Sequence, residues 1–398
     1  MMNHLKKIHF LIAFLATIGG YAQSTNPVAQ IPFELSGEHV FLQLTINDSE
    51  QLDFIFDTGA GATVINSETA TRLNFVSNKT STATGASGET QSSIIKNKSI
   101  ELGSIKLEKM DLVSVPLEHL EKTMGKDIDG IIGYGLLEKY VTEINYHYSK
   151  LILYESKSYD YQGNGEVVSL KIKNNLPMAT FQVILKEGSY VDEKFMLDTG
   201  AGLAMGFTAP FARKSQIKNK IGKTYSSTPK GISTSTTQVE VGKIKKLKLA
   251  NFEFENIPAN IYDIKTGFFA SKEVAGIIGN EILRKFNITF DYKGKKSYWV
   301  KNKYFDEAFY IQNSGLKLSF DADKSKVIIR GIIPNSSAEE SELKAGDEIV
   351  EIDGVKASES SLEALRKLLA TQSGKKVKIK YRRAGEVKEI LLSLKPLI

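Results

Sequence analysis

Residues 54–66 read FIFDTGAGATVIN, and residues 195–207 read FMLDTGAGLAMGF. Each stretch is an apolar run, then Asp-Thr-Gly-Ala-Gly, then a second mostly apolar run. Such self-similarity within one chain decides its architecture, so it has to be interpreted before any local motif. The repeat predicts that the chain contains two copies of one structural unit.

The similarity continues on both sides of these stretches. Upstream, apolar residues alternate as in paired strands, and downstream each copy has Ile-Ile-Gly followed by a strand, a turn and a strand. From Asp to the glycine of Ile-Ile-Gly there are 76 residues in the first copy (57 to 133) and 81 in the second (198 to 279). The corresponding segments are 31–47 with 168–185, 129–137 with 275–283, and 138–154 with 284–300.

Two joins divide the chain into three folded units. The first, at 156–166, is polar and carries two glycines, as connections do. The second lies near 301–313. After it the pattern becomes strands, an amphipathic helix at 360–370 and a closing hairpin turned at Ala384-Gly385. We therefore predict a first lobe at 27–155, a second lobe at 166–300 and a small domain at 314–398.

The N-terminal segment 1–22 has the layout of a secretory signal. Lys6 and Lys7 precede an apolar core of about 13 residues, and small residues stand at Gly20 and Ala22. We expect cleavage after Ala22, export, and a periplasmic or extracellular mature protein. The alternative is an N-terminal membrane anchor, but the core is shorter than the roughly 20 residues that a spanning helix needs.

Composition argues against several classes of function. The formal charge of +6 falls to +4 without the signal, which is too mild to indicate nucleic-acid binding. The Lys-rich run 214–248 lacks stacking aromatic residues and is expected to be a solvated face. The chain has no cysteine, which excludes disulfides, metal thiolates and a nucleophilic thiol.

The three histidines outside the signal do not predict a metal site or a Ser-His-Asp site. His39, His119 and His147 are not spaced as metal ligands or close to acidic partners, so we expect them at surface or turn positions. Trp299 and the Tyr and Phe residues fall at strand positions and are expected in the core. The sequence calls for no cofactor and no metal.

Asp57 and Asp198 each stand on a tight turn at the end of an apolar strand. If the two copies pack about a pseudo-twofold axis, the two carboxyls face each other, cannot both ionise and share one proton. The ionised group could then take a proton from water while the protonated group polarises a substrate carbonyl. Such a pair could hydrolyse an amide without a covalent intermediate.

The two copies resemble the aspartic proteases, and their DTGA and IIG motifs most resemble the retropepsin-like branch. The resemblance implies a mostly β, two-lobed, pseudo-twofold fold with Asp57 and Asp198 as catalytic residues. It also implies that Thr58 and Thr199 join the two loops, and that Ile-Ile-Gly packs beneath each loop. The supporting loop residues would be Thr58, Gly59, Ala60, Thr199, Gly200 and Ala201.

Pepsin-like members of this family usually have Ser or Thr after the glycine, where this chain has Ala60 and Ala201. Without that hydroxyl donor the carboxyl pair should have a higher pKa. We therefore expect activity at mildly rather than strongly acidic pH.

The family closes over its substrate with glycine-containing hairpins called flaps. Residues 82–93, with Gly85 and Gly88 near the tip, fit this place in the first copy, and residues 225–238, with Gly231, fit it in the second. The alternative is a pair of ordinary exposed hairpins.

The C-terminal unit resembles a PDZ domain, a small α+β fold, over nearly its whole length. The segments LKAGDEI at 343–349 and IDG at 352–354 carry the resemblance. It implies that a peptide binds as an added strand beside the helix at 360–370. The alternative is a groove filled by this protein's own chain. The carboxylate-binding loop would comprise Gly315, Leu316, Lys317 and Leu318.

Together these features predict an exported aspartic endopeptidase whose PDZ domain recruits peptides or regulates access. The expected partners are a peptide or protein substrate and a peptide ligand of the PDZ groove, with no nucleic acid and no membrane span after signal cleavage. We expect a monomer with an internal pseudo-dimer. One rival is a catalytically silent peptide-binding protein of the same fold, and another is a homodimer in which the copies pair between chains.

Overall fold

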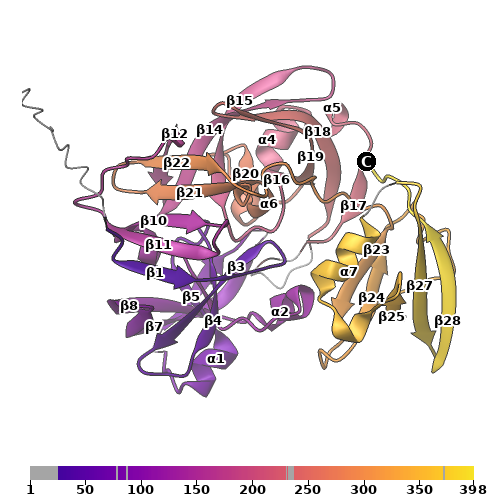
Figure 1. The fold of residues 1–398 in the computed structure, drawn as a ribbon, viewed down its shortest axis with the longest axis horizontal. Helices are drawn as coiled ribbons and strands as arrows, with labels where there is room; N and C mark the ends of the chain where they lie inside the picture. The colour runs from indigo at the N-terminus through magenta and orange to yellow at the C-terminus, as the bar shows by residue number, and fades with distance from the viewer. Residues whose placement is uncertain (1–25, 78, 87, 230, 232–236, 371–372) are drawn as a thin grey trace, which may run out of the picture.

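The computed structural model shows two β lobes and a separate C-terminal unit (Figure 1). The fold is mostly β, as the sequence predicts. The expected signal segment lies outside the residues that the structure describes. No helix within the described residues is long and apolar enough to cross a membrane. The described residues are 26–77, 79–86, 88–229, 231, 237–370 and 373–398.

The first lobe is built on an eight-stranded sheet. In this sheet β4 runs parallel to β9, so the residues that follow these two strands meet at one edge. Three short helices complete the lobe: α1 (Ser67–Arg72), α2 (Glu118–Met124) and α3 (Tyr134–Leu137). The strand order is β2 (Glu34–Ser36), β3 (His39–Ile46), β4 (Leu52–Phe56), β9 (Gly130–Ile132), β5 (Thr63–Asn66), β8 (Ile105–Val115), β7 (Glu89–Leu102) and β6 (Lys79–Thr84).

The second lobe repeats this sheet strand for strand. Here β15 runs parallel to β20, as β4 does to β9. Its order is β13 (Lys171–Lys173), β14 (Leu176–Ile184), β15 (Tyr190–Asp198), β20 (Gly276–Gly279), β16 (Met205–Phe207), β19 (Phe252–Tyr262), β18 (Val239–Leu249) and β17 (Tyr225–Ser227). Its helical segments are α4 (Ala209–Lys214), α5 (Ile217–Lys220), η1 (Phe268–Ala270) and α6 (Asn280–Leu283). The predicted internal repeat is therefore confirmed by topology.

A third sheet joins the two lobes, and each lobe contributes three strands to it. At its centre β10 and β21 pair antiparallel, with Glu143 opposite Thr289. Because these two strands are equivalent in the repeat, the pseudo-twofold axis passes between them. The order is β1 (Ala29–Pro32), β11 (Lys150–Glu155), β10 (Tyr140–Asn145), β21 (Phe286–Asp291), β22 (Lys296–Lys301) and β12 (Glu166–Ser169).

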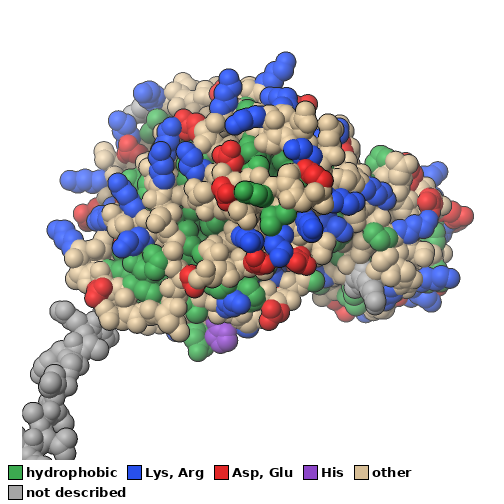
Figure 2. Space-filling model, turned by 90° about the horizontal axis from the view of Figure 1, so that it is seen from above, with side chains coloured by type: hydrophobic (Ala, Val, Ile, Leu, Met, Phe, Trp, Pro, Cys, Tyr) green, Lys and Arg blue, Asp and Glu red, His purple; other side chains and the backbone are tan. Residues whose placement is uncertain are grey.

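The apolar faces of these sheets form one core that runs through both lobes. Trp299 is 1% exposed and packs edge-on against Phe181 and Phe286. This confirms that Trp299 is a core residue. On the surface, the face in Figure 2 shows Lys and Arg side chains scattered among Asp, Glu and uncharged residues rather than gathered in one stripe.

The C-terminal unit has its own apolar core. Ser361 caps α7, since its hydroxyl accepts a hydrogen bond from Ala364 N. Ala384 and Gly385 both have positive φ and turn the closing hairpin, as predicted. The sheet order is β23 (Leu316–Phe320), β24 (Val327–Ile332), β25 (Glu348–Ile352), β27 (Lys376–Arg383) and β28 (Glu386–Ser393), with β26 (Val355–Lys356) on β25. The helical segments are η2 (Ala357–Glu359) and α7 (Leu362–Leu369).

Candidate active site

Both Asp-Thr-Gly loops stand where a strand ends beside an Ile-Ile-Gly strand. Asp57 directly follows β4, and its N–H donates to Ile132 O in β9 at 2.9 Å. Asp198 ends β15 and lies opposite Gly279 of β20. Each aspartate is thus placed by a buried apolar strand and a parallel neighbour, and the two loops meet at the junction of the lobes.

The structure brings the two carboxyls face to face. A Cβ atom added to Gly59 would lie 2.7 Å from Asp198 Cγ. A Cβ atom added to Gly200 would overlap Asp57 Cγ in the same way. Each glycine therefore leaves the space that the carboxyl of the other loop occupies, and a side chain at either position would push the two loops apart.

Thr58 and Thr199 lock the loops together across the pseudo-twofold axis. The N–H of each donates to the other's Oγ1 at 3.0 Å. Thr58 Oγ1 also donates to Leu197 O at 2.7 Å, and Thr199 Oγ1 donates to Phe56 O at 3.2 Å. Both threonines are fully buried. These four bonds tie each loop to the strand that carries the opposite aspartate.

The surroundings of the two carboxyls favour one shared proton. Burial raises the pKa of the Asp57 carboxyl. Burial, and then the negative charge of Asp57, raise the pKa of Asp198 well above its usual range. Gly59 N donates to Asp57 Oδ1 at 2.7 Å, whereas Asp198 Oδ1 has no hydrogen-bond partner among the described residues. Two facing carboxyls whose pKa values are both raised hold one proton between them.

The Ile-Ile-Gly segments support the loops from beneath. Gly133 leaves no room for a Cβ atom against Asp57 O, and Gly279 leaves none against Leu203 O. Ala60 O accepts from Tyr134 N at 3.0 Å, and Ala201 O accepts from Asn280 N at 2.8 Å. The residue after each glycine thus holds the alanine of its own loop. The methyl groups of Ala60 and Ala201 pack in apolar clusters.

The first flap candidate is a hairpin that reaches the opposite lobe. Its strands are β6 and β7, and Gly85 N donates to Gly88 O at 2.7 Å across the tip. Gly85 O accepts from Phe268 N at 2.9 Å, and Ala86 O accepts from Phe269 N at 3.0 Å. Since η1 belongs to the second lobe, the hairpin bridges the two lobes.

The second flap candidate follows β17, and much of its tip lies outside the described residues. Gly231 is described. A Cβ atom there would lie 3.4 Å from Ala86 Cβ, so Gly231 lies against the tip of the first hairpin. Gly231 O also lies 2.7 Å from His119 Nε2, on α2 of the first lobe.

The predicted PDZ residues lie on an edge strand. Gly315 has a φ of +83° and little space beside Ser336. Leu316, Lys317 and Leu318 begin β23, the outermost strand of its sheet. An edge strand beside a helix is the geometry to which an extended peptide can be added.

The family model described as aspartyl protease matches residues 42–136, and the model described as PDZ domain matches residues 314–394. The chain contains an aspartyl protease domain and a PDZ domain. The aspartyl protease match includes Asp57 and Gly133 of the first lobe. The match ends before the second lobe, whose main sheet has the same strand order as that of the first lobe.

No curated protein matches the chain. Among solved structures, a photosystem II D1 C-terminal processing protease is 23% identical over 23% of this chain and 25% of its own, with a TM-score of 0.21.

Two tyrosines that contact the opposite lobe were not predicted from the sequence. Tyr146 donates its hydroxyl to Asn280, and the equivalent Tyr292 packs against Tyr134 with ring centroids 6.3 Å apart. The two tyrosines occupy equivalent positions in the two copies. Each contacts the residue that follows Ile-Ile-Gly in the other lobe. Alignment of the two copies shows this correspondence of the tyrosines.

One prediction about the histidines is wrong. His39 is not a surface or turn residue: it begins β3 and is only 8% exposed. A Cβ atom added to Gly202 would lie 2.7 Å from His39 Cε1, so the imidazole packs against the loop that follows Asp198. Burial lowers the pKa of His39, which favours its neutral form at neutral pH.

Proposed function

We propose that this chain is an aspartic endopeptidase in which Asp57 and Asp198 activate one water molecule. The observation that carries the proposal is the pair of facing carboxyls held by the crossed Thr58–Thr199 hydrogen bonds. Two carboxyls so close, with raised pKa values, share one proton between them.

In the proposed reaction the ionised Asp57 takes a proton from the water. Protonated Asp198 gives its proton to the carbonyl oxygen of the substrate, while the water oxygen forms a bond to the carbonyl carbon. The tetrahedral intermediate then collapses as Asp57 returns its proton to the leaving nitrogen, the C–N bond breaks, and Asp198 recovers the other proton. The cycle restores the single shared proton and uses only protein groups and water.

Apolar walls beside the pair indicate where a substrate would lie. In the first lobe Ala60 packs with Phe41, Ile131 and the flap residue Ala83. In the second lobe Ala201 packs in a cluster that includes Tyr262 and Phe269. An extended peptide passing beneath the two hairpins would contact both walls. The PDZ domain would recruit peptides or regulate this access.

We also propose that the mature protein is exported, to the periplasm or beyond the cell, because residues 1–22 have the layout of a secretory signal. A single chain supplies both aspartates, so we propose that the monomer is the active form.

The proposed function is tested by incubating the purified mature chain with a mixed peptide library between about pH 4 and 7. We expect cleavage that is strongest at mildly acidic pH and falls as the shared proton is lost. Asp57→Asn and Asp198→Asn should both abolish it. A folded wild-type chain that binds peptides and cleaves none would instead favour the peptide-binding protein of the same fold.

A further inference from the structure

The free edge of the PDZ strand β23 is already occupied by the chain itself. Leu316 N donates to Ser314 Oγ at 3.1 Å, and Leu316 O accepts from Gln312 Nε2 at 3.0 Å. Leu318 O accepts from Arg366 of α7 at 2.8 Å. A peptide added as a strand needs such backbone groups, so it must first displace these bonds.

Helix α2 of the first lobe covers the same groove. It packs against β23, and in Figure 1 it lies at the edge of the first lobe that faces the C-terminal unit. At its C-terminus Gly125 has a φ of +75° and lies directly against the ring of Phe320 and close to Leu362. Arg366 spans the groove and donates to Thr123 O at 3.0 Å. The PDZ groove is therefore closed by the protease domain.

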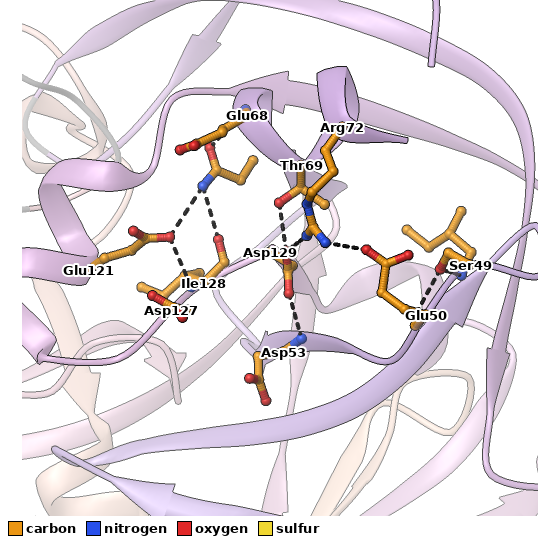
Figure 3. A network of polar contacts seen from close by, with 12 residues as sticks. Ser49, Glu50, Asp53, Glu68, Thr69, Arg72, Glu121, Asp127, Ile128 and Asp129 are labelled. Carbon is orange, nitrogen blue, oxygen red and sulfur yellow. Dashed lines mark hydrogen bonds and ion pairs between the residues drawn. The ribbon is translucent and has the colours of Figure 1, made fainter. Parts of the chain in front are cut away.

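Ion pairs fasten α2 to the PDZ domain. Lys324 Nζ lies 2.7 Å from Glu121 Oε2 and 2.6 Å from Asp127 Oδ1. Figure 3 shows the other side of this junction, where Glu121 Oε1 accepts from Ile128 N inside the first lobe. The same oxygen accepts from Asn66 Nδ2. Glu121 thus holds α2 to its own lobe with one oxygen and to the PDZ domain with the other.

The same helix also contacts the active-site region. His119 Nε2 lies 2.7 Å from Gly231 O at the second flap. Leu120 is buried in the cluster that contains Ala60, next to the loop of Asp57, and Ala83 of the first flap. One short helix therefore contacts the PDZ groove on one side, and Gly231 and the apolar cluster beside Ala60 on the other.

We propose that α2 is a latch, defined here as residues 118–127, which closes the PDZ groove and holds the second flap at the same time. An extended peptide that enters the groove along β23 displaces the latch, and the second flap is then released. The ligand class is a peptide whose apolar residues replace the contact at Phe320 and whose acidic side chain replaces Glu121 and Asp127 at Lys324. The proposal rests on the proposed function only for its effect on cleavage.

The latch is tested without any cleavage assay, by hydrogen exchange of the full-length chain. Lys324→Glu should open the latch and raise the exchange of amides in both α2 and β17, by roughly tenfold. Lys324→Glu with Asp127→Lys should move both rates back toward wild type. Lys356→Glu is the matched control, because Lys356 pairs with Glu359 within the PDZ domain, and should change neither.

The link through His119 is tested separately. His119→Ala should speed exchange in β17 alone, and adding Lys324→Glu should then increase the β17 rate no further, since both changes cut the same connection. Faster exchange in α2 with unchanged β17 would overturn the proposal. So would unchanged exchange in both elements, or additive effects on β17. A chain without peptidase activity could still pass this test, so failure of the latch and failure of the proposed function are distinguishable.

Discussion

At the scale of single residues, the two carboxyls can approach each other only because Gly59 and Gly200 have no side chain. The opposite carboxyl fills the position that each Cβ atom would take. Glycine is thus required here for close approach between the two loops, because neither has a positive φ.

Gly200→Ala should lower kcat/KM by at least about 100-fold while the chain stays folded, because a displacement of the reacting groups by about 1 Å has that effect. Gly61→Ala, on the first loop, is the matched control: its Cβ atom would lie 3.2 Å from the nearest atom, and it should be far milder. The measurement is peptide cleavage with circular dichroism as the folding check. Equal effects of the two substitutions would contradict this account of the glycine.

Asp198→Asn should stabilise the protein at neutral pH. The folded-state pKa of Asp198 is raised above its unfolded value, so the folded chain loses stability as the pH rises through this window. Asparagine removes the cost of ionising a buried carboxyl, so the melting temperature at pH 7 should rise by at least about 2 °C.

At about pH 3, where the Asp198 carboxyl is protonated in both the folded and the unfolded chain, this gain should disappear. Thermal unfolding at the two pH values, beside wild type, is the measurement. An equal rise in melting temperature at both pH values would show that the stabilisation does not come from removing the ionisable carboxyl of Asp198.

At the scale of elements, the sequence predicts those segments whose signal is local. The apolar runs before Asp57 and Asp198, the Ile-Ile-Gly strands and the hairpin at Ala384-Gly385 all combine strand periodicity with turn residues, and each forms as expected. The pairing of the two lobes follows from the repeat. Even the candidate dyad is predictable, because both halves carry the same motif.

Contacts between distant segments are not predictable in this way. His39 is buried because a loop 163 residues later packs on it at Gly202. Helix α2 reads EHLEKTM, which carries no signal that it will lie against β23. The sequence left open a PDZ groove filled by this protein's own chain, without fixing which segment fills it. In the structure a linker residue, Gln312, and α2 both take part.

The hydrogen bonds that join the loops of Asp57 and Asp198 through Thr58 and Thr199 give a prediction at this scale. Thr58→Val should lower the free energy of unfolding by about 2–3 kcal/mol, because it removes a buried donor and leaves Thr199 N–H without its acceptor. Thr58→Ser keeps the hydroxyl and should cost less. Urea unfolding of both variants measures the difference. If valine and serine are equally well tolerated, the crossed hydrogen bonds do not hold the lobes together.

At the scale of the whole molecule, one chain carries both halves of the candidate site. The two eight-stranded sheets have the same strand order, and β10 of one lobe pairs with β21 of the other. The PDZ domain rests on the first lobe through α2, away from the shared sheet (Figure 1). This arrangement places the candidate dyad, the two flap candidates and the PDZ groove in a single polypeptide.

The central claim is that Asp57 and Asp198 of the same chain form one active site. The most direct test is to purify Asp57→Asn and Asp198→Asn separately, measure peptide cleavage by each, and then measure it again after mixing them in equal amounts. We predict no cleavage by either variant and none by the mixture, beside an active wild type. Activity that returns on mixing would show that the site forms between chains, and cleavage by either variant alone would show that these carboxyls are not the catalytic pair.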